Sequence, residues 1–230
     1  MQHVPLYKRL SLCRNDILIT LFEQGDGRWL NIILLLCNTF FMKSIVFMQG
    51  NPVYKGHMAL FESVLEYSDT LDVFISSRRN RPRDLPYCIR KRAVEVAVQN
   101  FPYRDRVNIL DVQASYCEIR SQLYAILAVG SDIAHQLVAP TEKWKPGEAE
   151  YFLSFPSLLV LQRPGSLLTD EVAQVIRARV QNLIISPPKV EFSSTDLRRR
   201  YRDGEDISTM LPESVWDVIS NHVSCFHSET

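Results

Sequence analysis

The sequence predicts an α/β fold, a single domain with a doubly wound, mostly parallel, Rossmann-like sheet of about five to six strands. Short apolar segments rich in Val, Ile, Leu and Phe recur along the chain without polar alternation, as in strands buried on both faces. Longer segments with helical spacing separate them. Because strand and helix alternate, each connection should cross over the sheet and bring the chain back in a parallel direction.

The elements can be assigned in order along the chain. The predicted strands are 44–48, 71–76, 107–112, 124–130, 157–162 and 182–186. The predicted helices are 57–67, 86–100, 132–138, 170–182, 195–202 and about 212–224. In the helix at 170–182, the apolar residues lie on one stripe, with arginines on the other side; they are Val172, Val175, Ile176 and Val180. Ser and Thr residues begin the helix at 195, and Pro212 suits the first turn of the last helix.

Residues 1–41 differ from the rest of the chain and are interpreted as an N-terminal extension outside the fold, which begins at Met42 and occupies 42–230. The apolar segment 29–41, "WLNIILLLCNTFF", is shorter than the roughly 18 residues that indicate a membrane span. It also lies too far from the N-terminus for an ordinary signal peptide. A membrane-associated helix is the alternative, but the segment lacks a basic face.

The charge and cysteine content of the chain argue against some classes of ligand and partner. Lys and Arg number 26, and Asp and Glu number 26, so no net charge attracts the chain to nucleic acid or to an anionic membrane. The five cysteines are scattered without CxxC or Cys/His spacing, which is typical of reduced thiols in a cytoplasmic protein without a structural metal site. The basic segment 77–92 is either solvated charge or a loop that faces a substrate phosphate.

Ligands of such a sheet bind at the carboxyl ends of the strands, where loops lead into helices. After the first predicted strand comes "MQGNPVYKGHM", in which Gly50 permits a tight turn and Gly56-His57 begins a helix. A histidine beside the free N–H groups of a helix N-terminus is well placed to touch a phosphate oxygen. The alternative is an ordinary surface histidine at a helix start.

A second candidate phosphate-binding segment lies after the last predicted strand. Ser193, Ser194 and Thr195 precede "DLRRRY", so hydroxyl groups stand at the positive end of a helix, with Arg198 one turn further on. Arginine can donate two parallel hydrogen bonds to a phosphate. The alternative is a plain helix cap, because Ser and Thr accept hydrogen bonds from exposed N–H groups.

Together the two segments resemble the nucleotidyltransferase superfamily, with an (H/T)xGH motif early and an ISSTxxR motif late, and are most similar to its nicotinate-mononucleotide adenylyltransferase branch. The resemblance covers about residues 42–222 and includes "LPYCIRKRAVEVAV", "LAVGSDIAHQL" and "LLVLQRPG". The RTEGISTT-type motif of cytidylyltransferases is missing. Two departures stand in the early motif: "MQGNP" lacks the phenylalanine of GxFxP, and Tyr54 replaces the first histidine.

The resemblance implies a role for each matching position. His57 and Arg198 would be the catalytic residues. The ATP- and phosphate-binding positions would be Gly50, Asn51, Tyr54, Gly56, Gly130, Asp132, Ser193, Ser194 and Thr195. Trp144 would stack near the pyridine ring of the mononucleotide. The alternatives are a helix N-cap for Asp132 and an ordinary half-buried side chain for Trp144.

The implied reaction transfers AMP from ATP to a mononucleotide, nicotinate or nicotinamide, in NAD biosynthesis. The attacking phosphate is already ionised near neutral pH, so positioning and charge stabilisation are required rather than a general base. Mg²⁺ would be held mainly by the ATP phosphates, without a metal cage of protein ligands. An adenylyl- or cytidylyltransferase with another acceptor, and a nucleotide-binding module with little turnover, are the alternatives. A homo-oligomer is compatible with the sequence.

Overall fold

The computed structural model describes residues 19–20, 33–34, 41–77, 84–110, 119, 121–140 and 144–227. The chain divides into two units, Met1–Phe41 and Met42–Thr230. In the first unit, strands β1 (Ile19–Thr20) and β2 (Ile33–Leu34) pair antiparallel. The apolar segment 29–41 lies almost wholly outside the described residues. That residues 1–41 are an N-terminal extension outside the fold therefore stays a prediction.

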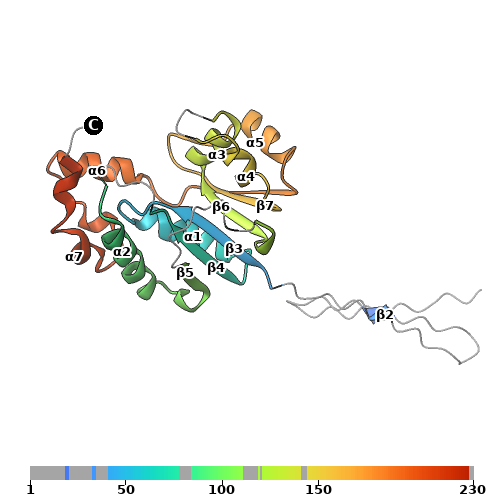
Figure 1. The fold of residues 1–230 in the computed structure, drawn as a ribbon, viewed down its shortest axis with the longest axis horizontal. Coiled ribbons are helices and arrows are strands. Elements are labelled where there is room, and N and C mark those ends of the chain that lie inside the picture. Colours follow the sequence, from blue (N-terminus) through green and yellow to red (C-terminus); the bar gives the residue numbers. More distant parts are fainter. Residues whose placement is uncertain are drawn as a thin grey trace, which may run out of the picture. The chain divides into compact units, whose positions relative to one another are not determined.

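The second unit contains a sheet of six parallel strands in the order β5-β4-β3-β6-β7-β8 (Figure 1). Its strands are β3 (Lys43–Met48), β4 (Thr70–Ile75), β5 (Val107–Leu110), β6 (Ile126–Gly130), β7 (Ser157–Leu161) and β8 (Asn182–Ser186). From β3 the chain runs outward to β5, then returns to β6 and runs outward in the other direction. The doubly wound parallel sheet that the sequence predicts is confirmed, and its order reverses between β3 and β6.

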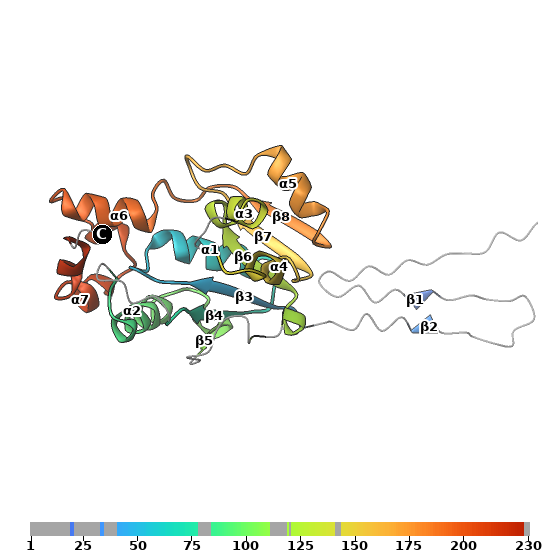
Figure 2. The ribbon, with the colours of Figure 1, turned by 45° about the horizontal axis from the view of Figure 1, so that its top comes forward.

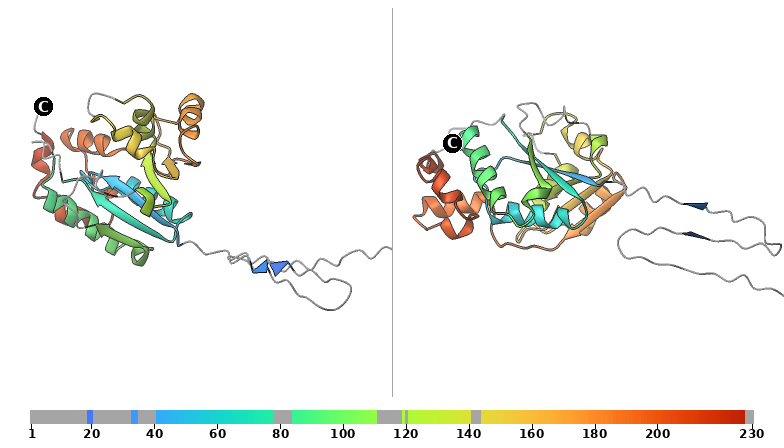
Figure 3. Two further views of the ribbon diagram at one scale, coloured as in Figure 1. Left: turned by 45° about the vertical axis from the view of Figure 1, so that its right-hand side comes forward. Right: turned by 90° about the horizontal axis from the view of Figure 1, so that it is seen from below.

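Helices cover both faces of this sheet (Figure 2; two further views are given in Figure 3). The helices are α1 (Lys55–Leu65), α2 (Tyr87–Gln99), α3 (Ser131–Val138), α4 (Glu148–Phe152), α5 (Asp170–Arg177), α6 (Ser194–Arg202) and α7 (Val215–Ile219). Short 3₁₀ turns are η1 (Arg104–Arg106), η3 (Ser121–Leu123), η4 (Ser208–Met210) and η5 (Val223–His227).

Two apolar cores result, one on each face of the sheet. The first core joins the sheet to α1, α2, α6 and α7. The second joins it to α3, α4 and α5. Successive residues of β3 serve opposite cores: Val46 packs in the first and Ile45 in the second. Burial on both faces explains why the central strands show no polar alternation in the sequence.

Two predicted helices end differently in the structure. The helix predicted at 170–182 stops at Arg177, because the N–H groups of Gln181 and Asn182 donate to the carbonyl of Pro156 and lead the chain into β8. The helix predicted at 212–224 is broken into α7 and η5. Pro212 lies before α7 rather than in its first turn, because the N-cap residue Ser214 has a left-handed φ of 61°.

No helix in the described part of the chain is long and apolar enough to cross a membrane. Of the five cysteines, Cys88 and Cys225 lie within the described residues, and both are free thiols.

A buried polar cluster lies at the amino-terminal edge of the sheet, around Asp72 of β4. This carboxylate is 1% exposed and accepts hydrogen bonds from the Tyr124 hydroxyl at 2.8 Å and from Asn108 Nδ2 at 3.2 Å. Lys43 Nζ lies 2.7 Å from it. Burial first, and the hydrogen bond to Asp72 second, raise the pKa of Tyr124. The buried charge is thus compensated from both neighbouring strands and from the segment before β6.

We expect Tyr124→Phe to lower the free energy of unfolding by about 1.5–3 kcal/mol, because it leaves one side of a buried carboxylate without its donor. Urea denaturation measures the change. Tyr103→Phe is the matched control, since Tyr103 is 40% exposed, and its effect should stay within about 0.5 kcal/mol. Equal stability of the two variants would contradict a structural role for the buried hydroxyl.

Candidate active site

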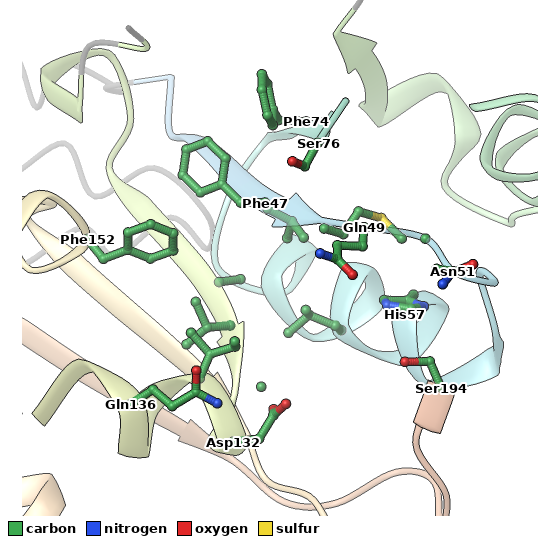
Figure 4. Close-up of a pocket in the computed structure, with 18 of the residues that line it drawn as sticks. Phe47, Gln49, Asn51, His57, Phe74, Ser76, Asp132, Gln136, Phe152 and Ser194 are labelled. Atoms are coloured by element: carbon green, nitrogen blue, oxygen red, sulfur yellow. The ribbon is translucent and has the colours of Figure 1, made fainter. Parts of the chain in front are cut away.

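A cavity of about 370 Å³ opens at the carboxyl ends of β3 and β6 (Figure 4). The order of the strands reverses between these two, and the loops that follow them diverge to opposite faces of the sheet. Residues from β3, β4, α1, α3, α4 and α6 line the cavity. It is therefore assembled from segments that are far apart in the sequence.

The turn after β3 forms one wall of this cavity. Gly50 has a φ of 61°, in the left-handed region that favours glycine. The side chain of the next residue, Asn51, is held by two hydrogen bonds: Nδ2 donates to Asp84 Oδ1 at 2.6 Å, and Oδ1 accepts from the Leu85 N–H at 3.0 Å. Asn51 lines the cavity, and its contact with a ligand stays a prediction.

His57 lies in the first turn of α1, 9% exposed, and lines the cavity. Its Nδ1 accepts a hydrogen bond from the backbone N–H of Tyr54 at 3.2 Å. A neutral imidazole with an accepting Nδ1 carries its proton on Nε2. Burial first, and the positive charge of Arg163 second, lower the pKa of His57 to about 3. The side chain is therefore a neutral N–H donor at a helix N-terminus.

The two neighbours of His57 in the early motif lie behind the cavity wall. Neither Tyr54 nor Gly56 lines the cavity. The Tyr54 ring is 1% exposed and packs against the imidazole, with 4.4 Å between the ring centroids. A direct contact of either residue with phosphate stays a prediction.

At the start of α6, the three hydroxyl groups of the late motif have two different roles. Ser193 is the N-cap: its Oγ accepts from the Asp196 N–H at 3.1 Å and donates to Asp196 Oδ2 at 2.7 Å. Ser194, Thr195 and Arg198 line the cavity, whereas Ser193 does not. The cap and the ligand-facing interpretation of this segment therefore apply to different residues.

The two helix openings meet at one place. Arg198 Nη1 donates to the backbone carbonyl of Asn51 at 2.5 Å, across 147 positions of sequence, and Nη2 donates to Thr195 Oγ1 at 3.1 Å. His57, Ser194 and Arg198 line the same cavity. Figure 4 shows His57 between Asn51 and Ser194. The rim thus combines an N–H donor, hydroxyl groups and a guanidinium, the groups that bind phosphate oxygens.

A further charged pair borders the cavity at the start of α3. Gly130 is the N-cap of this helix, so the alternative of Asp132 as the cap is wrong. Asp132 Oδ2 instead lies 3.0 Å from Arg163 Nη1. A Cβ on Gly130 would stand 2.6 Å from Asp132 Oδ1 and 2.9 Å from Arg163 Nε, so glycine is what lets this pair sit against the strand end.

The sequence analysis missed Arg163 as a site residue. It lies just after β7, separated from it by Gln162, within the segment "LLVLQRPG", and lines the cavity. Its position just past the carboxyl end of a buried strand was the available signal, because every parallel strand of the sheet ends at this rim.

The other end of the cavity is aromatic. Trp144, the predicted ring-stacking residue, lines it and donates from Nε1 to Gln136 Oε1 at 2.8 Å. Its ring centroid lies 5.3 Å from that of Phe152, which lies 5.4 Å from Phe47. Figure 4 shows Phe47, Phe74 and Phe152 gathered away from His57 and Ser194. The sequence analysis missed these phenylalanines, because apolar residues in strands and in a five-residue helix look like ordinary core.

Arg90 of α2 is a second residue that the sequence analysis did not single out, although it lies in the basic segment 77–92. It is 1% exposed. Nη1 donates to the carbonyls of Gln49 at 2.6 Å and Ser76 at 2.8 Å, and Nε donates to that of Leu85 at 3.0 Å. Gln49 and Ser76 line the cavity at the ends of β3 and β4. Arg90 therefore holds two strand ends together beneath the site.

Metal ligands do not gather at the site: within the described residues, no group of three or more His, Cys, Asp or Glu side chains could hold a metal ion. The acidic residues that line the cavity are Asp132, which pairs with Arg163, and Glu148, which accepts from the Lys145 N–H at 3.0 Å.

The sequence comparisons support the resemblance expected from the two motifs. No family model matches the chain. A probable nicotinate-nucleotide adenylyltransferase of Roseiflexus castenholzii is 26% identical over 183 residues, covering 72% of this chain and 88% of the relative. One of Bacteroides thetaiotaomicron is 24% identical over 190 residues, covering 75% and 88%. The chain thus resembles this branch of nucleotidyltransferases along nearly the whole length of the relatives.

Comparison with solved structures supports the fold. The nicotinic acid mononucleotide adenylyltransferase of Plasmodium falciparum, complexed with APC, superposes with a TM-score of 0.62 at 15% identity. Its complex with NaAD gives a TM-score of 0.62 at 16% identity. Both matches cover 81% of this chain and 98% of the other. At this identity the likeness concerns the fold.

We expect Arg90→Lys to destabilise the protein by about 1–3 kcal/mol, because an ammonium cannot reproduce the forked hydrogen bonds to three carbonyls. Urea denaturation measures this loss. Arg92→Lys is the control: its guanidinium is 58% exposed and pairs with Glu95 at 3.5 Å. Indistinguishable stability of the two variants would contradict the role of Arg90 in holding the ends of β3 and β4 together.

Proposed function

We propose that the protein is an adenylyltransferase that transfers AMP from ATP to a mononucleotide, with nicotinate mononucleotide as the first candidate acceptor and pyrophosphate as the second product. The observation that carries the proposal is the meeting of the α1 and α6 openings at one rim, opposite an aromatic end of the same cavity. The names of the sequence relatives give the reaction and the acceptor.

The polar end of the cavity suits the triphosphate of ATP. Ser194 and Thr195 offer hydroxyl groups at the N-terminus of α6, where the helix dipole also favours negative charge. Arg198 adds a fixed positive charge for the β- and γ-phosphates. His57 would donate from Nε2 to the α-phosphate, and because it stays neutral, it does so without losing its proton as the pH rises through 7.

The rest of the cavity suits the two nucleosides. We assign Gly130 and Asp132 to the ribose and adenine side of ATP, since they end β6 and begin α3 beside the phosphate rim. Trp144, with Phe152 behind it, offers a flat apolar surface for the pyridine ring of the acceptor. The two substrates would thus meet above the carboxyl ends of β3 and β6.

In the proposed reaction an oxygen of the acceptor's 5′-phosphate attacks the α-phosphorus of ATP. A new P–O bond forms, the bond from the α-phosphorus to the bridging oxygen breaks, and pyrophosphate leaves with the electron pair. No general base is needed, because the attacking phosphate is already ionised. His57 and Arg198 would act by holding the reactants in line and by stabilising the charge that grows on the leaving group.

The arrangement also fits Mg²⁺ that arrives with ATP. Phosphate oxygens and water would hold the ion, and Asp132 is a carboxylate on the cavity wall. When bound, Mg²⁺ neutralises part of the charge of the polyphosphate. A cytoplasmic location and a homo-oligomer stay predictions.

Another acceptor, or a binding module with little turnover, is the second candidate, favoured by the altered early motif at "MQGNPVYKGH". To decide, the purified full chain is incubated with ATP, Mg²⁺ and a panel of mononucleotides, and pyrophosphate is followed. We expect release with nicotinate mononucleotide and formation of the dinucleotide, detected by mass spectrometry. ATP binding without pyrophosphate for every acceptor would identify a binding module instead.

We expect His57→Ala to lower kcat by about 100-fold while ATP affinity falls by less than about tenfold, since the contact should strengthen as charge develops. Steady-state kinetics and calorimetry with ATP measure the two effects separately. His222→Ala, an exposed histidine between α7 and η5, is the control and should match the parent protein. Equal losses of turnover and affinity would argue against the assignment.

A further inference from the structure

Tyr54 stands where the early motif of the resembling enzymes has its first histidine, and its surroundings differ from those of a ligand-binding side chain. The side chain is 1% exposed and does not line the cavity. Its ring meets the His57 imidazole edge to face, with 4.4 Å between centroids and an interplanar angle of 76°. Burial first raises the pKa of the phenol, so the side chain is neutral at physiological pH.

The absence of a side chain at Gly56 leaves space for the Tyr54 ring. A Cβ on Gly56 would lie 2.3 Å from Tyr54 Cε2, 2.6 Å from Cζ and 2.7 Å from the hydroxyl oxygen. All three nearest atoms belong to the same side chain, so the ring lies flat across the space that a glycine leaves open at the start of α1. Any other residue at position 56 would displace the ring.

The other side of the ring reaches the second helix opening. The Tyr54 and Phe192 ring centroids lie 5.7 Å apart, and Phe192 immediately precedes Ser193, the N-cap of α6. Tyr54 is therefore packed between the residue that begins the late motif and the histidine that ends the early one. This aromatic contact lies behind the cavity, whereas the hydrogen bond from Arg198 to Asn51 lies on its wall.

We propose that Tyr54 is a positioning residue. Its ring holds the His57 imidazole in place and excludes water from the side of the imidazole that faces away from the cavity. Through its contact with Phe192, the ring also positions the start of α6 relative to α1. The catalytic consequence rests on the proposed adenylyltransferase function. The motif's histidine is thus replaced by a side chain that supports the phosphate-binding groups without itself touching phosphate. This differs from the direct phosphate contact that the family resemblance implies for position 54.

The charged groups around the imidazole are consistent with this role. Burial is the largest cause of the low pKa of His57, ahead of the charge of Arg163 after β7. Asp132 of α3 and Arg198 of α6 line the same cavity. Arg163, Asp132 and Asp196, in that order, lie close enough to influence the Tyr54 phenol. If the Tyr54 ring is removed, water reaches the imidazole and burial, the main cause of the low pKa of His57, is lost, while these charges stay in place.

The test compares Tyr54→Phe and Tyr54→Ala in the full chain, with two readouts. The first is the pKa of His57 in the ligand-free protein by NMR titration, which does not depend on any activity. The second is kcat and KM for the adenylyl transfer. Tyr124→Ala is the matched control, since it removes another buried tyrosine, 6% exposed, at the opposite edge of the sheet. All measurements are made well below each variant's melting temperature.

We expect Tyr54→Ala to raise the His57 pKa from about 3 toward its ordinary value of about 6.5, and to lower kcat by about 10- to 100-fold through misplacement of the donor. Tyr54→Phe keeps the ring, so its His57 pKa should stay low and its kcat should fall far less. Tyr124→Ala should melt at a lower temperature with an unchanged His57 pKa.

A double variant isolates the ring itself. Gly56→Ala alone should reproduce the effects of Tyr54→Ala, because the new methyl group displaces the ring. In the Tyr54→Ala background the same change should add no further loss, because the clash has gone.

Two results would overturn the inference. One is a His57 pKa that stays near 3 in Tyr54→Ala. The other is a Tyr54→Phe variant as impaired in kcat as Tyr54→Ala, which would assign the hydroxyl a direct contact with substrate. If the parent protein transfers no adenylyl group to any acceptor, the proposed function fails, but the titration still decides whether Tyr54 positions His57.

Discussion

The hydrogen bond from Arg198 to the backbone carbonyl of Asn51 joins the two helix openings at the site, and the proposed chemistry depends on it. It links α6, near the end of the chain, to the turn after the first strand of the sheet. Two helix N-termini alone would give two weak anion sites. Brought together, they surround one cavity with N–H, hydroxyl and guanidinium donors, and that combination distinguishes the proposed triphosphate site from two capped helices.

Much of the fold could be predicted from the sequence because its strands are buried on both faces. The strand at 182–186 was predicted with the bounds of β8, and those at 44–48 and 71–76 differ from β3 and β4 by one residue. Helix ends were harder, because they depend on tertiary contacts. Arg177 ends α5 where the backbone turns to bond Pro156, and the left-handed Ser214 interrupts the last helix.

The candidate site could be predicted where local chemistry marks it and was missed where only the fold assembles it. His57, Ser194, Thr195 and Arg198 stand in short polar motifs at helix starts, and all of them line the cavity. Arg90 and Phe47 carry no such mark. An arginine in a basic segment looks like solvated charge, and a phenylalanine in a strand looks like core. Arg90 matters because it donates to carbonyls at two strand ends, and Phe47 matters because it lines the cavity.

The aromatic end of the cavity differs from the polar end in how it is built. Trp144 precedes α4, a helix of five residues, and Phe152 lies within it. The polar end is held by the turn after β3, by α1 and α6, and by the buried side chain of Arg90. Under the proposed function, substitutions or insertions around α4 therefore change the acceptor side of the cavity while the phosphate-binding groups of α1 and α6 stay in place.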